Sequence, residues 1–368
     1  MIQQDMAMSN PYSQLPAKAF WRSAIAEQHP LDIHSLWAPK HSLPRDAPII
    51  TAGSCFAQHI GRAQKTRGYH WLDTEPAPPF VSDALKKRFN YGIFSFRTGN
   101  IYTAALFKQW LDWAIGDVAP PDEAWEENGR WYDPFRPNIE PDGFAGRAEM
   151  LASRSGTLSA IRSGLEGAEI IVFTLGLTEA WLNRGSGHVY PMCPGTVRGI
   201  FLPDAHVFKN YGYAEIKQDL TDALDMIKRV NPKARFLLTV SPVPLTATAA
   251  GEHVLVATNY SKSTLRAVAG DTAARTDTDY FPSYEIITSF PFRGMFFEPN
   301  LRNVSPHGVD FVMDTFFRCL NEAFPSSPDM GPQILPSLRP VPDLVGEIDD
   351  DVQCEEELLS AFSPSAAP

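Results

Sequence analysis

Ser54 and Cys55 stand where an apolar run ends and a helix-like stretch begins. Residues 48–52 read Pro-Ile-Ile-Thr-Ala, which is typical of a buried strand, and residues 56–67 have helical character. A side chain between them lies at a helix N-terminus, where free backbone N–H groups and the helix dipole can stabilise an oxyanion. Ser54 is therefore a candidate nucleophile. An N-cap for the helix is the alternative interpretation of the same serine.

Two further predicted strands also end in polar residues. Gly176, Thr178 and Glu179 follow the second strand, and Ser241 follows the third. Open α/β sheets place their sites at the carboxyl ends of their strands, so these residues are candidates for substrate or oxyanion binding. Gly176 would let the backbone approach a ligand. A glycine turn followed by a helix cap would explain the first group without any ligand.

Several titratable side chains could serve the same site. His253 lies in the loop after the third strand, whereas His59 lies just over one turn into the first helix and is expected to project away from the serine. Cys55 could be the nucleophile instead, since a helix N-terminus favours a thiolate, or it could be a structural cysteine. Cys193 and Glu285 also follow predicted strands, where they could line a pocket, orient a base or only support the fold.

The chain alternates short apolar runs with amphipathic stretches. The runs that predict strands cover residues 48–52, 169–175, 235–240 and 278–281. The stretches that predict helices cover residues 56–67, 213–230, 260–270 and 307–324. Strands that are apolar throughout and separated by helices indicate a parallel sheet covered on both faces. The sequence therefore predicts an α/β fold with a central parallel sheet.

The predicted domain spans residues 47–324, with additions in three places. Residues 1–46 are expected to form an extended arm over the body. An aromatic-rich insertion at about residues 70–165 is expected to be a helical elaboration beside the sheet edge, a wall or lid for a site. Residues 325–368 hold nine acids against one arginine, which is −8 of the net charge of −11. This segment predicts a disordered acidic tail, in which Glu355–Phe362 could become a helix on a partner.

The composition excludes several functional classes. With 44% hydrophobic and 20% charged residues, the chain has the make-up of a globular protein, and no run approaches the roughly 20 apolar residues of a membrane span. No secretory signal is predicted. The four cysteines are far apart, which argues against a disulfide framework or zinc site and favours the cytoplasm. No basic patch interleaved with aromatics indicates nucleic-acid binding.

Six segments in order carry a resemblance to a known family. They read GSCFA (53–57), FTLGLTEAW (173–181), YPMCPGT (190–196), LLTVSPVPLTAT (237–248), YSKSTLRA (260–267) and DYFPSYEII (279–287). Together they resemble the GSCFA family over about residues 47–323. GSCFA proteins look like relatives of the SGNH (GDSL-type) hydrolases. The resemblance therefore implies a flavodoxin-like three-layer α/β/α sandwich.

The SGNH pattern implies roles for individual residues. Its nucleophilic serine falls on Ser54, which here follows Gly53 instead of an aspartate. The asparagine of its Gly-x-Asn-Asp block, which completes the oxyanion hole, falls on Thr178, whose shorter side chain can still donate one hydrogen bond. The backbone N–H groups of Ser54 and Gly176 would complete the hole.

The last SGNH block, Asp-x-x-His, supplies the general base and its orienting carboxylate. It falls on Asn300 and Asn303, so both titrating groups are replaced by amides. An asparagine cannot take a proton from a serine near neutral pH. A small register shift could bring in His307, with Glu298 or Asp310 as its carboxylate partner.

The residues and the resemblance together predict a cytoplasmic SGNH-like esterase. Ser54 would attack a small acyl ester, such as an acetyl ester or an O-acetylated glycan, and His307 or His253 would relay the proton. This chemistry requires no metal and no cofactor. Two alternatives stay open: an acyltransferase of bacterial polysaccharide biosynthesis, and a non-catalytic relative that binds a glycan or a protein.

Overall fold

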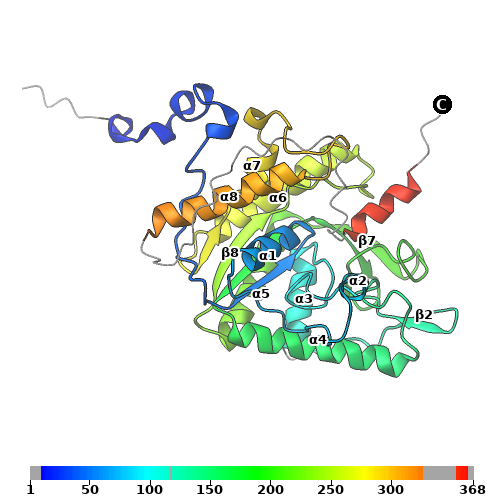
Figure 1. Ribbon diagram of the computed structural model, residues 1–368. Helices are drawn as coiled ribbons and strands as arrows, with labels where there is room; N and C mark the ends of the chain where they lie inside the picture. The colour runs from blue at the N-terminus through cyan, green and yellow to red at the C-terminus, as the bar shows by residue number, and fades with distance from the viewer. Residues whose placement is uncertain (1–9, 117, 326–353, 364–368) are drawn as a thin grey trace, which may run out of the picture.

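The computed structural model describes residues 10–116, 118–325 and 354–363. Its centre is a parallel four-stranded sheet in the order β1-β4-β8-β9 (Figure 1). These strands are β1 (Ile49–Gly53), β4 (Ile170–Leu175), β8 (Arg235–Val240) and β9 (Thr278–Tyr280). Trp71 adds an isolated parallel bridge to Ile49 on the free edge of β1. The order across the sheet is therefore flavodoxin-like, with the second strand reduced to one bridge.

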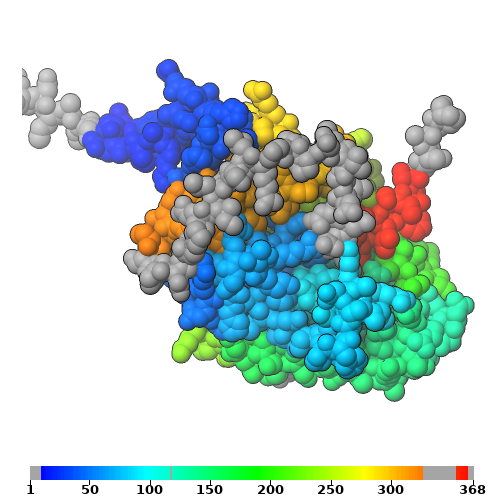
Figure 2. Space-filling model, viewed as in Figure 1, coloured from blue at the N-terminus to red at the C-terminus, as the bar shows by residue number. Residues whose placement is uncertain are grey.

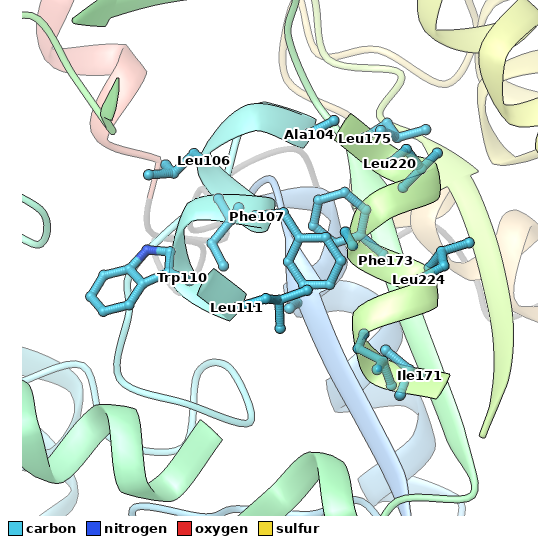
Figure 3. Close-up of a cluster of buried hydrophobic side chains, with 14 of the residues drawn as sticks. Ala104, Leu106, Phe107, Trp110, Leu111, Ile171, Phe173, Leu175, Leu220 and Leu224 are labelled. Atoms are coloured by element: carbon cyan, nitrogen blue, oxygen red, sulfur yellow. The ribbon is translucent and has the colours of Figure 1, made fainter. Parts of the chain in front are cut away.

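One face of the sheet is covered by four helices. They are α3 (Ala104–Ala114), α4 (Arg147–Gly167), α5 (Tyr213–Val230) and α6 (Val254–Thr272). Alternate strand residues such as Ile171 and Phe173 point into this layer, as the period of a strand requires. Phe107 of α3 stacks on Phe173 with ring centroids 4.1 Å apart, and Leu220 and Leu224 of α5 close the cluster (Figure 3).

The opposite face is covered by α1 (Phe56–Thr66), α7 (Ser283–Thr288), η5 (Phe290–Phe292) and α8 (Pro306–Ala323). The intervening strand residues, such as Ile170 and Val172, point into this second core. Ile33 and Trp37 of the N-terminal arm pack into it as well. The arm holds four short helices, η1 (Pro11–Gln14), η2 (Ala17–Ala19), η3 (Arg22–Ala26) and η4 (Pro30–Asp32). The predicted three-layer α/β/α sandwich is confirmed.

The insertion contributes one of the layers that cover the sheet. It contains α2 (Asp83–Arg88), α3, the hairpin of β2 (Trp125–Glu127) and β3 (Arg130–Tyr132), and most of α4. Because the apolar residues of α3 and α4 are buried against the sheet, they form one of its covering layers. The expected place beside the sheet edge therefore differs from the observed one. The aromatic residues that suggested a lid are the residues that fill this core.

A buried ion cluster fixes the insertion internally. The Asp133 carboxylate is fully buried and accepts from Arg136 Nε at 2.7 Å and from Arg154 Nη2 at 2.7 Å. Although burial alone would raise the pKa of Asp133, the two arginines hold it below its usual value. The carboxylate therefore stays charged and links α4 to the hairpin region.

A second, antiparallel sheet was not foreseen from the sequence. It has the order β6-β5-β7 and consists of β5 (Glu179–Asn183), β6 (Val189–Tyr190) and β7 (His206–Asn210). Its first strand begins at Glu179, directly after the polar residues that follow β4. The segment after Gly176 is therefore extended, and it does not cap a helix.

The last described residues fold back onto the body. Glu355–Phe362 form a short 3-10 helix, η6, coloured red in Figures 1 and 2, and Glu356 in it is buried. We refer to Cys354–Phe362 as the C-terminal segment. Here the structure differs from the expected disordered tail, whose residues 326–353 and 364–368 lie outside the described part of the chain.

Candidate active site

The turn between β1 and α1 places Ser54 at the carboxyl end of the sheet. Gly53 has a φ of +130°, and a Cβ atom there would lie 2.4 Å from the Thr174 carbonyl oxygen, so only glycine fits. Ser54 is 2% exposed, and its Oγ has no hydrogen-bond partner among the described residues. Cys55 is the N-cap of α1, with no side-chain cap bond. Ser54 is therefore not the helix cap that the sequence also allowed.

Two backbone donors expected for an oxyanion hole are already paired. The parallel ladder extends to Gly53, and the Ser54 N–H then donates to Thr174 O at 3.1 Å. The Gly176 N–H donates to Tyr102 O at 3.1 Å. A Cβ on Gly176 would lie 2.9 Å from Ser54 Cβ, so Gly176 packs directly on the serine. In this arrangement neither N–H is free to hold an oxyanion, contrary to the expectation from the family pattern.

Thr178 is the expected oxyanion donor whose hydroxyl stays available. Its side chain is buried and its Oγ1 has no partner within the described ranges, while its N–H donates to Ser261 Oγ at 3.2 Å. The neighbouring candidates have structural partners instead. Glu179 accepts from Thr248 Oγ1 at 2.6 Å, and Ser241 Oγ accepts from the N–H two residues later at 3.3 Å. Both therefore shape the loop that follows β8.

Lys262 of α6 brings a buried cation to the same strand ends. The residue is 1% exposed, and its Nζ donates to Gly176 O at 2.7 Å. Burial lowers the pKa of the ammonium from 10.5 to about 8, and the charge of Glu356 offsets only part of this effect. A lysine in this condition can exchange a proton near neutral pH.

The loop before α8 presents an arginine between the two asparagines. Asn300 Oδ1 accepts from the N–H groups of Arg302 and Asn303, both at 2.9 Å, so it forms a turn. Asn303 Oδ1 accepts from Arg302 Nη1 at 3.4 Å. The Arg302 side chain is 14% exposed, and its Nε is buried with no partner in the described structure. Both asparagines therefore support the loop that carries Arg302.

We refer to Ser54, Thr178, Lys262 and Arg302 as the cluster at the strand ends. The C-terminal segment covers this cluster. The Cys354 sulfur is hydrogen-bonded with the Cys55 thiol, next to Ser54 in the chain. The Glu355 carboxylate accepts from Tyr102 OH at 3.1 Å and from the Asn100 amide. A segment from the end of the chain thus occupies the surroundings of the serine.

The two thiols of the pair have different acidities. The hydrogen bond with Cys354, together with burial, raises the pKa of Cys55 well above its usual value. The bond from Cys55, together with the positive charge of Arg302, lowers the pKa of Cys354. Cys55 is therefore held as a thiol, which disfavours it as an alternative nucleophile.

The predicted histidines are not gathered around Ser54, whose Oγ bonds to none of them. His253 is exposed and caps α6, where its ring accepts from the Leu255 N–H at 3.2 Å. His307 is exposed in the first turn of α8, and its ring lies 5.8 Å from that of Phe296. His59 packs its ring against Phe56 within α1.

The remaining candidates lie in other surroundings. Glu285 pairs with Arg266 and accepts from Tyr280 OH at 2.8 Å, beside a cavity of about 350 Å³ between the N-terminal arm and α7. Cys193 donates to the next carbonyl at 3.6 Å, and burial raises its pKa to about 11. Another cavity, of about 610 Å³, lies between α3 and α5.

The described part of the chain offers neither a metal site nor a membrane-spanning helix. In residues 10–116, 118–325 and 354–363, no group of three histidine, cysteine or acidic side chains could hold a metal ion. None of the helices in those ranges has the length and apolar character that crossing a membrane requires.

The residues of the cluster that sequence reasoning missed are Lys262, Arg302, Tyr102 and the C-terminal pair Glu355 and Glu356. Lys262 carried a usable signal, because it shares the helix face of the apolar residues three and seven positions later. A charge on an apolar face indicates a buried functional group or ion pair. The other residues had no local signal, since their meeting depends on loops and on a segment distant in sequence.

Comparison with known proteins gives a family and a distant structural likeness. The model of the GSCFA family matches residues 48–316. No curated protein matches the sequence. Among solved structures, an acetyl xylan esterase from the rumen bacterium Butyrivibrio proteoclasticus is 12% identical with a TM-score of 0.30. That match covers 76% of this chain and 64% of the esterase, so the chain spans less than two thirds of its length.

Proposed function

Starting from the fact that the chain belongs to the GSCFA family, we propose that it is an SGNH-like ester hydrolase with Ser54 as nucleophile. Its substrate would be a small acyl ester, such as an acetyl group on a glycan. The observation that carries the proposal is the Ser54 hydroxyl, which is buried at the carboxyl end of β1 without a hydrogen-bond partner among the described residues.

Unpaired buried hydroxyls favour a functional role over a structural one. Most buried polar side-chain atoms in native proteins have a partner, and leaving one unpaired costs about 1–3 kcal/mol. Within the described ranges neither Ser54 Oγ nor Thr178 Oγ1 has a hydrogen-bond partner, and the two residues follow neighbouring parallel strands, β1 and β4. The free-energy cost of such unpaired polar atoms is typical of functional sites, where a bound ligand supplies the missing partner.

Lys262 is the group best suited to take the proton of Ser54. Its Nζ is bonded to the carbonyl of Gly176, the residue that packs on the serine, and it can be neutral at mildly alkaline pH. Serine–lysine pairs serve as nucleophile and base on unrelated folds. The exposed His253 and His307 would require loop movement to reach the serine, so they stay the second choice.

The reaction would run in two balanced steps. Ser54 Oγ attacks the acyl carbon while its proton passes to Lys262, and the oxyanion receives a hydrogen bond from Thr178. The carbon–oxygen bond to the alcohol then breaks, and the alcohol leaves with the proton from Lys262. Water, which gives a proton to the same amine, next attacks the acyl carbon. The bond between this carbon and Ser54 Oγ breaks, Lys262 returns the proton to the serine, and the acid is released.

The test is hydrolysis of 4-nitrophenyl acetate by purified full-length protein. Ser54→Ala should lower kcat by about 10³-fold or more, whereas Ser241→Ala, a matched loss of a buried hydroxyl outside the chemistry, should retain most of it. Cys55→Ala should also retain activity. An active Ser54→Ala variant with the wild-type circular dichroism spectrum would overturn the serine mechanism.

A non-catalytic role has one specific observation in its favour. Asn300 and Asn303 replace the SGNH acid and base and are used to shape a loop. If the wild-type protein hydrolyses no ester but binds glycans, the result would support this non-catalytic function. Product analysis with a sugar acceptor would separate hydrolysis from the acyltransferase that the sequence left open.

A further inference from the structure

The C-terminal segment places a carboxylate in a site that is built to bind an anion. One oxygen of Glu356 accepts from Arg302 Nη2 at 3.2 Å, and the other accepts from the Thr246 N–H at 2.8 Å. Lys262 adds a further positive charge nearby. The Glu356 side chain is 6% exposed and that of Arg302 14%. The contact is therefore a desolvated carboxylate–guanidinium pair with a backbone donor, which resembles how proteins bind carboxylate ligands.

Glu356 uses only part of the polar groups in this place. Arg302 Nε and Thr246 Oγ1 are both buried and have no partner among the described residues, and the same is true of Ser54 Oγ and Thr178 Oγ1. A glutamate side chain ends in one carboxylate and cannot supply further acceptors or donors. A ligand that carries both a carboxylate and hydroxyl groups would satisfy more of them.

The segment is held at a cost in desolvation. Burial raises the pKa of Glu356 even though Arg302 and the Thr246 N–H oppose the shift, and burial likewise raises the pKa of Glu355. The two glutamates therefore dock less favourably when their carboxyl groups are ionised. This is expected of a segment that a ligand can displace.

We propose that Arg302 and the Thr246 N–H form a subsite for the carboxylate of an acidic sugar ester, and that Glu356 occupies it until such a substrate binds. This inference rests on the proposed function and names its substrate class as an acylated, uronate-type glycan. The carboxylate of the sugar replaces that of Glu356, its hydroxyl groups meet the unpaired donors, and its ester reaches Ser54 once the segment has moved aside.

The matched pair of Glu356 and Glu357 makes the proposal testable in the full-length chain. Both residues contact Arg302, but Glu357 does so at 3.1 Å from an exposed position, with 47% of its side chain accessible. Exposed pairs contribute little. A tethered carboxylate competes at an effective concentration on the order of mM. Removing the whole Glu356 carboxyl group should therefore unmask the subsite, and removing that of Glu357 should not.

The experiment measures binding of D-glucuronate by isothermal titration calorimetry, with D-glucose as the neutral control. Glu356→Ala, which removes the carboxyl group, should bind glucuronate about tenfold more tightly than wild type, and Glu357→Ala should stay within about twofold. Adding Arg302→Lys to Glu356→Ala should weaken binding about tenfold, since the forked geometry is lost. In wild type, glucuronate should speed hydrogen exchange of residues 354–362.

Failure of this inference can be told apart from failure of the proposed function. Glu356→Ala combined with Ser54→Ala should keep the tight binding although it cannot hydrolyse an ester, so binding is measured independently of catalysis. No saturable binding of glucuronate to Glu356→Ala would overturn the subsite. Equal affinity for glucose, or equal affinity in wild type, would overturn it as well and would leave the segment as a structural staple.

Discussion

Replacing Lys262 by methionine tests the energetics and the chemistry of the site together. Burial lowers the pKa of this amine from 10.5 to about 8. The difference, 10.5 − 8 = 2.5, corresponds to about 3 kcal/mol, because one pKa unit is about 1.4 kcal/mol. Below pH 8 the amine is protonated in both the folded and the unfolded chain, so this cost is present in full. The cost falls as the pH rises above 8 and is gone above 10.5.

Methionine has a similar length and no charge, so Lys262→Met removes this cost. It also leaves Gly176 O without its donor, a loss of about 1–3 kcal/mol. The two effects oppose each other, and the free energy of unfolding at pH 7 should stay within about 2 kcal/mol of wild type. As the pH rises from about 8 to 10, the free energy of unfolding of wild type should increase relative to that of the variant. Urea denaturation at several pH values measures both.

Activity should respond far more than stability. If Lys262 takes the proton of Ser54, kcat/KM of wild type should rise with pH through about 8, and Lys262→Met should lose about 10²–10⁴-fold. Lys217→Met is the control, since Lys217 lies on α5 and pairs with Asp271 at 3.0 Å. Wild-type activity in the folded Lys262→Met variant, or a flat wild-type profile across pH 8, would refute the assignment.

Three further outcomes are expected. Gly53→Ala should destabilise the fold by about 3 kcal/mol or more, because its Cβ would meet a backbone oxygen at 2.4 Å, whereas Gly68→Ala, at φ +75° with nothing within 4 Å, should cost only about 1 kcal/mol by chemical denaturation. Asp133→Asn should cost about 3–5 kcal/mol in the same assay, since two buried arginines lose their counter-charge. A raised pKa for Glu356 means that docking is favoured below its ordinary pKa and weakens as the pH rises through the raised value. Hydrogen exchange of the C-terminal segment, corrected for intrinsic rates, should therefore be slower at pH 5 than at pH 8, and the opposite order would contradict the reasoning.

The proposed role of Lys262 is compatible with the amides at positions 300 and 303. Asn300 and Asn303 shape the loop that carries Arg302, so their amides have a structural use. A buried lysine on a neighbouring helix can then supply the proton transfer that the proposed reaction requires.

The local pattern of apolar residues was sufficient to predict the strands of the central sheet and the helix α5. The four apolar runs became β1, β4, β8 and β9, and the helical spacing of residues 213–230 became α5 with the same limits. These features depend on the period of side chains along one segment, which the sequence displays directly. The antiparallel sheet was missed, because its short strands have no clear period. The insertion that contains α3 was expected to be helical, but the limits of α3 were not predicted.

The sequence by itself determined that Ser54 stands at the end of a buried strand and before a helix. Only the tertiary structure decided what surrounds it. Lys262 and Arg302 reach the strand ends from other elements, and Glu356 reaches them from a segment about 300 residues away in the chain. Such contacts arise from the packing of whole layers, which involves no local periodicity. For the same reason the residues beside Ser54, unlike its position at the strand end, could not be read from the sequence.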